Sequence, residues 1–175
     1  MERKLSKIYT QYKSLPLLLL AIVCFFLKVC NAEEIISSPI NPLKVVDGDS
    51  LEIGSSRIRL TGIDAPEYLQ QCKRKNKKLP CGKQATEHLK KLTNNKTVRC
   101  VVHQKDRYDR FLCTCYVDEL DLNAEMIRSG FAVTYLDSPY ATEQAEAKTK
   151  KRGIWQTKFM QPRLYRRLKE LQKSK

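Results

Sequence analysis

Hydrophobic and polar residues along the chain follow the period of a strand first and the period of a helix later. Residues 43–53 are largely apolar but are interrupted at Asp47 and Gly48, and residues 57–61 alternate charged with apolar side chains. These patterns predict two strands. We expect a bulge or turn to break the first strand and redirect Asp49, and the second strand to carry its arginines on one face.

The same patterns predict further strands and helices. Strands are expected over residues 97–102, 110–117 and 131–136, and helices over residues 82–95, 121–130, 138–153 and, strongly basic, 164–171. Residues 70–80 are expected to form a basic loop. With β-rich segments first and helices later, the chain is predicted to be an α+β protein, a small barrel with helices packed on it.

Two of the predicted helices begin with capping signals. Asp121 is expected to cap a short helix that ends at Gly130, because aspartate accepts a bond from a free backbone N–H and glycine ends helices. Ser138 followed by Pro139 predicts the start of a helix that ends at Gly153.

The first 32 residues have the pattern of an export signal. Four basic residues precede an apolar run over residues 15–27, and Cys30 and Ala32 offer small side chains for cleavage before Glu33. We therefore expect a signal peptide and export to the periplasm or the extracellular space. A membrane anchor through residues 15–27 is the alternative, because nothing in the pattern forces cleavage.

The chain is strongly basic, and the leader does not account for this. The formal net charge is +14, and 28 basic and 18 acidic residues, a charge of +10, follow residue 32. Such a protein is expected to bind a polyanion, either a nucleic acid or an anionic membrane surface. Residues 73–78 and 163–175 are expected to add nonspecific affinity, and the leader or the tail could contact a membrane.

Five cysteines follow the leader: Cys72, Cys81, Cys100, Cys113 and Cys115. Their spacing does not match a zinc site, and an oxidising compartment favours disulfides. Cys72 and Cys81 bracket a polar loop and are expected to be bridged. Cys100 is expected to pair with Cys115, with Cys113 as the alternative, which leaves one thiol. Five reduced cysteines are the competing interpretation.

Three carboxylates and two arginines form the chemically most informative set. They are Asp49, Asp64, Glu67, Arg59 and Arg110. Carboxylate oxygens suit Ca²⁺ or Mg²⁺, and the guanidinium fork matches phosphate oxygens. A metal, two arginines and a further carboxylate could together hydrolyse a phosphodiester, because the cations neutralise growing charge and the carboxylate activates water.

The motifs DGDS, RIRLTGIDAPE, GKQATEHLKKL, DRYDR, DLNAEMIRSGFA and KKRGIW, in this order, resemble the staphylococcal nuclease (thermonuclease) family over residues 43–155. The resemblance implies a β-rich, OB-like five-stranded barrel with about three packed helices, in an exported bacterial protein. It also implies a monomeric, Ca²⁺-dependent endonuclease that cleaves DNA and RNA to 3′-phosphate products. The nuclease-like domain then spans residues 43–157, after a lead-in over 33–42 and before a basic helix or tail over 158–175.

The resemblance assigns roles to individual residues. Asp49 and Asp64 resemble the Ca²⁺ ligands, Glu67 the general base, and Arg59 and Arg110 the arginines that bind the reacting phosphate. The residues expected to contact the rest of the substrate are Arg107, Tyr108 and Tyr135.

Two positions depart from the family pattern. Ala65 stands where the family has a threonine at the metal site, and Asp109 stands in place of a turn glycine. Aspartate tolerates a positive φ better than most residues, but its carboxylate beside Arg110 is expected to weaken that arginine's pull on phosphate. A catalytically silent OB-type module that binds nucleic acid or a protein is the alternative function. Such a module, however, has no need of the five catalytic and metal-binding side chains.

Overall fold

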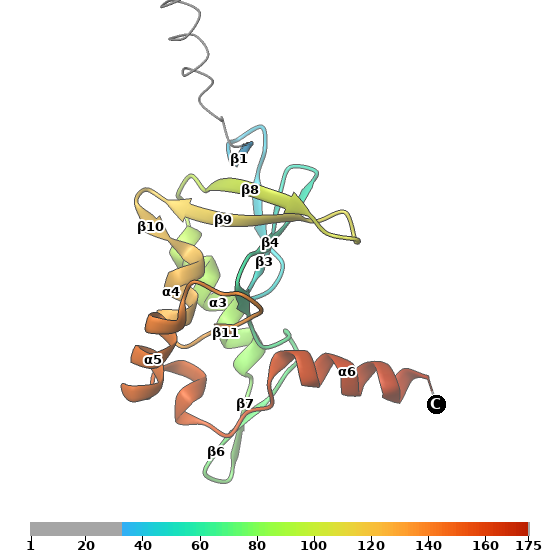
Figure 1. Ribbon diagram of the computed structural model, residues 1–175, viewed down its shortest axis with the longest axis vertical. Helices are drawn as coiled ribbons and strands as arrows, with labels where there is room; N and C mark the ends of the chain where they lie inside the picture. The colour runs from blue at the N-terminus through green and yellow to red at the C-terminus, as the bar shows by residue number, and fades with distance from the viewer. Residues whose placement is uncertain (1–32, 175) are drawn as a thin grey trace, which may run out of the picture. The chain divides into compact units, whose positions relative to one another are not determined.

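Residues 33–174 of the protein are described by a computed structural model (Figure 1). The predicted signal peptide or membrane anchor, residues 1–32, lies outside the described residues, as does Lys175. No helix within residues 33–174 is long and apolar enough to cross a membrane.

A curled, mostly antiparallel sheet organises the described domain (Figure 1). Its seven strands within residues 33–174 are β1 (Glu34–Ile36), β2 (Leu43–Val45), β3 (Ser50–Ile53), β4 (Ser56–Leu60), β8 (Arg99–Lys105), β9 (Phe111–Val117) and β10 (Leu120–Asp121). The strand order is β1-β8-β9-β4-β3-β2, and β10 pairs with β9. Strands β4 and β9 run parallel, which joins the two antiparallel halves of the sheet.

Two small sheets and several helices surround this sheet. β5 (Ile63–Asp64) pairs with β11 (Val133–Thr134), and β6 (Cys72–Arg74) pairs with β7 (Lys77–Leu79). The helices of the described part of the chain are α3 (Cys81–Thr93), α4 (Leu122–Arg128), α5 (Ala141–Thr149), α6 (Pro162–Lys173) and the 3₁₀ helix η1 (Gly153–Gln156). Figure 1 shows α6 as a separate arm at the C-terminal end.

Alternation along the strands determines which side chains enter the core. Leu51 and Ile53 of β3 and Ile58 and Leu60 of β4 are at most 2% exposed, and they pack with Leu89 of α3 in one cluster. This is the arrangement expected when one face of a curled sheet is covered by helices. The predicted β-rich α+β class and OB-like barrel are confirmed, with α3, α4 and α5 as the three packed helices. Within residues 33–174 the sheet contains seven strands where five are expected.

A buried amide joins α4 to the sheet. The Asn123 side chain accepts a hydrogen bond from the Cys115 N–H at 3.1 Å. It donates to the carbonyl oxygens of Thr61 at 2.9 Å and Cys113 at 3.0 Å. Because a buried amide without partners would be costly, these bonds fix the position of α4 against β9. The predicted cap is also present, since the Asp121 side chain accepts from the Ala124 N–H at 2.9 Å.

The structure differs from three local predictions. Residues 72–79 form the hairpin β6–β7 instead of a loop, because the disulfide between Cys72 and Cys81 closes its ends. The helix expected from Ser138 to Gly153 is α5, which covers only residues 141–149. The Ser138 hydroxyl accepts from the Tyr140 N–H at 3.2 Å and so forms a turn before the helix. Strand β1 lies in the segment expected to be only a lead-in.

The cysteines of the described chain are paired as predicted. Disulfides join Cys72 to Cys81 and Cys100 to Cys115. The register of β8 and β9 places Cys100 directly opposite Cys115 and Val102 opposite Cys113, which decides between the two candidates. Cys113 is a buried free thiol. Burial, with a smaller effect of Glu33, raises the pKa of Cys113 to about 12.

We expect Cys113 to resist iodoacetamide at pH 8 in the folded protein, because a buried thiol with a raised pKa forms little thiolate. Denaturation without reductant should make it react, while a non-reducing digest should retain the peptide pairs linked through Cys72–Cys81 and Cys100–Cys115. Mass spectrometry of peptides from residues 33–174 measures both results. Rapid labelling of the native protein, or a linked peptide containing Cys113, would contradict the assignment.

Candidate active site

A cavity of about 890 Å³ collects most of the predicted site residues. Its lining consists of Asp47, Asp49, Ser50, Arg57, Arg59, Glu67, Arg107, Tyr108, Arg110, Tyr135, Arg163, Arg166, Arg167 and Glu170. Seven of these residues are arginines and four are acidic, so positive charge is in excess along the wall. A hollow of this composition is suited to an anionic ligand.

The break between β2 and β3 directs Asp49 into this site. The Asp47 side chain accepts a hydrogen bond from the Asp49 N–H at 3.0 Å, as in a tight turn. Asp49 is 5% exposed, and its Oδ2 accepts from the Ala65 N–H at 2.6 Å. Burial raises the pKa of Asp47, against the opposing effects of Ser50 and Arg59. The predicted interruption at Asp47 and Gly48 therefore places Asp49 beside the segment that follows β5.

Arg59 of β4 is a buried cation held between two acids. Its side chain is 11% exposed and pairs with the carboxylates of Asp49 and, at 3.0 Å, Asp64. It also donates to the backbone carbonyl of Ile63 at 3.2 Å. Burial lowers the pKa of Arg59, and the attraction of Asp64 opposes that shift. Because one guanidinium contacts both carboxylates, Arg59 holds both predicted metal ligands around one centre.

Asp64 and Glu67 lie at the two ends of one short segment. Asp64 pairs with Val133 across β5 and β11, and its side chain is 2% exposed. Glu67 is held by a buried glutamine, because its backbone N–H donates to the Gln70 side chain at 3.2 Å. The Gln70 side chain donates in turn to the Met160 carbonyl at 2.7 Å. A buried polar side chain thus anchors the turn from which Glu67, 35% exposed, lines the cavity.

An arginine from α6 closes the acidic side of the site. Arg166 donates from Nη1 to Asp64 Oδ1 at 2.9 Å and to Glu67 Oε1 at 2.7 Å. Its Nη2 donates to Asp64 Oδ2 at 3.2 Å. Asp64 is therefore bound by two guanidinium groups, those of Arg59 and Arg166.

A tight turn between β8 and β9 supplies the other predicted substrate contacts. The Asp106 carboxylate accepts from the Arg110 side chain at 2.9 Å and from the Tyr108 N–H at 2.9 Å. Burial raises the pKa of Asp106, but the hydrogen bonds from Arg110 and Tyr108 outweigh it and lower the pKa overall. Arg107 donates to the Tyr108 hydroxyl at 2.7 Å. The turn thus presents Arg107, Tyr108 and Arg110 together on the cavity wall.

Asp109 has the positive φ, 60°, that a glycine would adopt at this position of the turn. Its carboxylate accepts from the Lys105 ammonium at 3.0 Å. Arg110 instead pairs with Asp106, at 2.7 Å. The expected competition of Asp109 for Arg110 is therefore reduced, because Lys105 engages that carboxylate.

The structure gathers the predicted site residues around one hollow, with one exception. Asp64 lies behind the wall, buried against Arg59 and Arg166. The sequence did not predict that the site would include the further lining residues Asp47, Ser50, Arg57, Arg163, Arg166, Arg167 and Glu170. The last four belong to the basic tail, for which only nonspecific affinity is predicted. Arg57 lies two residues before Arg59, and side chains two apart in a strand share a face of the sheet, so the sequence does indicate that these two arginines point the same way. Nothing in the local pattern of the basic tail distinguishes Arg166 from its neighbours.

The donors of the predicted metal site suit a hard cation. Asp49 and Asp64 offer carboxylate oxygens, which Ca²⁺ prefers. Among residues 33–174, however, no three His, Cys, Asp or Glu side chains are gathered as a metal site. Arg166 lies on Asp64 as a positive charge with hydrogen bonds to both oxygens. The residues therefore fit a cation with few protein ligands, with a guanidinium already bound to one of them.

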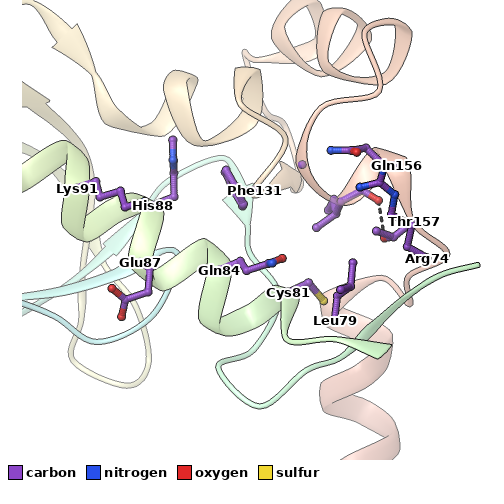
Figure 2. A pocket seen from close by; sticks show the side chains of 12 residues that line it. Arg74, Leu79, Cys81, Gln84, Glu87, His88, Lys91, Phe131, Gln156 and Thr157 are labelled. Atoms are coloured by element: carbon purple, nitrogen blue, oxygen red, sulfur yellow. Dashed lines mark hydrogen bonds between the residues drawn. The ribbon is translucent and has the colours of Figure 1, made fainter. Parts of the chain in front are cut away.

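A second, smaller cavity of about 300 Å³ lies beside α3 (Figure 2). His88 stacks on Phe131 there, with ring centroids 4.4 Å apart. Burial lowers the pKa of His88, which favours the neutral ring at pH 7. None of the predicted site residues lines this hollow, so the candidate chemistry belongs to the larger cavity.

An OB-like barrel that carries arginines and buried carboxylates around a basic hollow defines a protein of the OB-fold nuclease class. The chain belongs to the family of staphylococcal nuclease homologues, whose sequence model matches residues 57–157. This confirms the resemblance carried by the motifs and supports the prediction of a nuclease.

Similar proteins occur in several bacteria. The chain is 38% identical over 122 residues to a succinoglycan biosynthesis protein, ExoI, of Rhizobium meliloti, covering 66% of this chain and 64% of that protein. It is 38% identical over 122 residues to an uncharacterized endonuclease of Escherichia coli O157:H7, covering 65% of this chain and 74% of that protein. An uncharacterized endonuclease of Haemophilus influenzae is 32% identical over 145 residues, covering 78% and 75%.

We predict that Gly82→Ala displaces the segment that carries Glu67. A Cβ at position 82 would overlap the Glu67 carbonyl oxygen and lie 2.5 Å from its carbonyl carbon. The variant should lose about 1–3 kcal/mol of unfolding free energy, because overpacking forces backbone shifts. The Gln70 N–H, which donates to the Glu67 carbonyl at 2.7 Å, should exchange faster with solvent.

Denaturant unfolding and amide hydrogen exchange measure the two effects of Gly82→Ala. Lys83→Ala, at the next and exposed position of α3, is the matched control and should stay within about 0.5 kcal/mol of the wild type. Unchanged stability and unchanged exchange of Gln70 in Gly82→Ala would contradict the close approach.

Proposed function

We propose that this chain is a monomeric, Ca²⁺-dependent endonuclease that hydrolyses phosphodiester bonds of DNA and RNA and leaves 3′-phosphate ends. The observation that carries the proposal is the shared cavity of Arg59, Arg110 and Glu67. Two guanidinium groups and one carboxylate on one wall are one set of groups that, together with a cation, can support phosphodiester hydrolysis.

The two arginines differ in how they would meet the phosphate. Arg59 is fixed inside by Asp49 and Asp64, so its position is set before the substrate arrives. Arg110 is held from one side by Asp106 and is one third exposed, which leaves part of its fork toward the cavity. Both would donate to phosphoryl oxygens that gain charge in the transition state.

Glu67 is the general base of the proposed reaction. Its side chain is partly exposed toward the cavity, whereas Asp49 and Asp64 are buried. A carboxylate in that position could accept a proton from the attacking water or orient it. Asp49 and Asp64 would instead hold the cation, which would supply additional positive charge to the phosphoryl oxygens.

Residues around the reacting centre would bind the remainder of the polymer. Arg107, Tyr108 and Tyr135 line the same cavity and offer a guanidinium and aromatic rings to phosphate and bases. The hairpin β6–β7 adds exposed lysines beyond the cavity. These contacts are independent of base identity, which supports a substrate that is nucleic acid in general. The endonuclease names of the relatives in Escherichia coli and Haemophilus influenzae support the same activity.

Export is part of the proposal. The two disulfides within residues 33–174 are typical of proteins that fold in an oxidising compartment. They support the leader over residues 1–32 as a signal peptide, with an anchor as the alternative. The nuclease domain is proposed to span residues 43–157, followed by the basic segment 158–175.

We expect DNA cleavage to require added Ca²⁺ and to stop in excess EGTA. Asp64→Asn should raise the Ca²⁺ concentration for half-maximal rate by about tenfold or more, because a carboxylate ligand loses its charge. Cleavage of plasmid DNA over a Ca²⁺ titration measures this, and phosphatase treatment of the products identifies 3′-phosphate ends. Glu52→Gln, which removes a charge on β3 outside the cavity, is the matched control. Full turnover in EGTA would rule out the calcium assignment.

We expect Glu67→Gln to lower the cleavage rate by about 10²–10⁴-fold, the usual cost of losing a general base. DNA affinity should change by less than about tenfold, because Glu67 acts mainly in the transition state. Arg110→Lys should also cut the rate strongly, since a point charge cannot replace the guanidinium fork.

Single-turnover cleavage beside equilibrium binding of single-stranded DNA separates the enzyme from the silent module. Arg74→Lys, on the hairpin outside the cavity, is the control for Arg110→Lys. If the wild type binds DNA in Ca²⁺ but cleaves it no faster than Glu67→Gln, the protein is a binding module.

A further inference from the structure

Arg166 is bound to the two acids that the proposed reaction uses. It holds both oxygens of Asp64, at 2.9 and 3.2 Å, and Oε1 of Glu67 at 2.7 Å. An arginine side chain is a cation at any physiological pH. The guanidinium of Arg166 therefore occupies, as a positive charge, the carboxylate oxygens that a metal ion would need.

The rest of α6 contributes little apolar packing. Leu164, Leu168 and Leu171 are 49%, 39% and 55% exposed. At 100° per residue these leucines share one face of the helix, opposite Arg166. The helix therefore turns its basic face to the cavity and its apolar stripe to solvent. Its release would break ion pairs but expose little additional apolar surface.

The segment before α6 is attached firmly to the domain. Lys158 and Lys73 exchange backbone hydrogen bonds of 2.7 and 2.8 Å, and the Gln70 side chain donates to the Met160 carbonyl. Pro162, at the first position of α6, is buried. The helix is thus anchored at its start, and beyond that point Arg166 is its hydrogen-bonded link to Asp64 and Glu67. The whole of α6 also lies outside residues 57–157, the part of the chain that the family model matches.

We propose that α6 is an autoinhibitory strap whose Arg166 competes with a divalent cation for Asp64. The proposal rests on the proposed calcium-dependent function, because it concerns the same acids. While Arg166 is bound, Asp64 has its charge satisfied by guanidinium groups and Glu67 is engaged in an ion pair. Cation binding at Asp64 and release of Arg166 are therefore one equilibrium.

A polyanion is the ligand whose chemistry would release the strap. Arg163 and Arg167, also on α6, line the cavity together with Arg166. Phosphate oxygens match the guanidinium fork as carboxylates do, so a nucleic acid in the cavity offers α6 alternative partners. Binding of the polymer would then release Asp64 and Glu67 from Arg166 at the place where the polymer is held. Without the polymer, Arg166 would keep both acids paired and so weaken cation binding there.

Calcium binding measured by titration calorimetry, without nucleic acid, tests the competition in the full chain. Arg166→Ala should bind Ca²⁺ about tenfold more tightly than the wild type, as expected if the strap covers the site in about 90% of molecules. Arg166→Lys keeps the charge but loses the guanidinium fork, and it should bind Ca²⁺ with intermediate affinity. It replaces Arg166→Ala in the test if the alanine variant folds poorly. Lys169→Ala removes the same charge from an exposed residue of α6 that does not line the cavity, and should match the wild type.

Hydrogen exchange gives a second readout that does not depend on a variant. Saturating Ca²⁺ should speed the exchange of wild-type amides in α6, because the helix loses its attachment at Arg166. Amides of α3 should not change in the same way.

Equal Ca²⁺ affinity in the wild type and Arg166→Ala, or unchanged exchange in α6, would overturn the strap and leave the calcium-dependent nuclease intact. If neither protein binds Ca²⁺, the assignment of the cation site is wrong, and the proposal that α6 covers this site is rejected as well.

Discussion

The burial of one positive charge organises this site. Arg59 alternates along β4 with the core residues Ile58 and Leu60 and so points to the other face of the sheet. It is nevertheless only 9% exposed, so its guanidinium has little access to water. An unpaired buried cation is too costly to persist, and Asp49 and Asp64 are brought to it from either side. The turn before β3 and the pairing of β5 with β11 both serve this arrangement. The barrel therefore holds the predicted metal ligands through an arginine that is itself expected to bind phosphate.

Part of the positive charge of the cavity is balanced by its own carboxylates. Arg110 pairs with Asp106 and Arg166 with Glu67, whereas Arg57 and Arg107 donate to oxygens of Tyr108. The carboxylates that pair with these arginines keep them oriented. They also lower the positive electrostatic potential that an incoming phosphate would meet. The arginines of the site are thus held in position in advance. Part of their positive charge becomes available to a phosphate only when the phosphate replaces a carboxylate partner.

The sequence predicted the features that depend on local patterns. Alternation along β3 and β4 indicated the core, and the Asp47-Gly48 break indicated the turn that directs Asp49 inward. The hairpin β6–β7 escaped prediction because almost all of its residues are polar, and it is the disulfide that closes its ends rather than a hydrophobic face. Arg166 escaped prediction because it meets Asp64 across 102 residues, with no spacing rule to connect them.

The position of α6 has a consequence that its composition alone does not reveal. A basic tail usually attracts polyanions nonspecifically. Here a guanidinium of that tail is bound to Asp64 and Glu67, so it cannot neutralise a phosphate and those acids at the same time. Attraction of nucleic acid by Arg166 therefore requires that it leave the acids. The same side chain thus links binding of the polymer to exposure of the groups proposed to cleave it, which a tail separate from the site could not do.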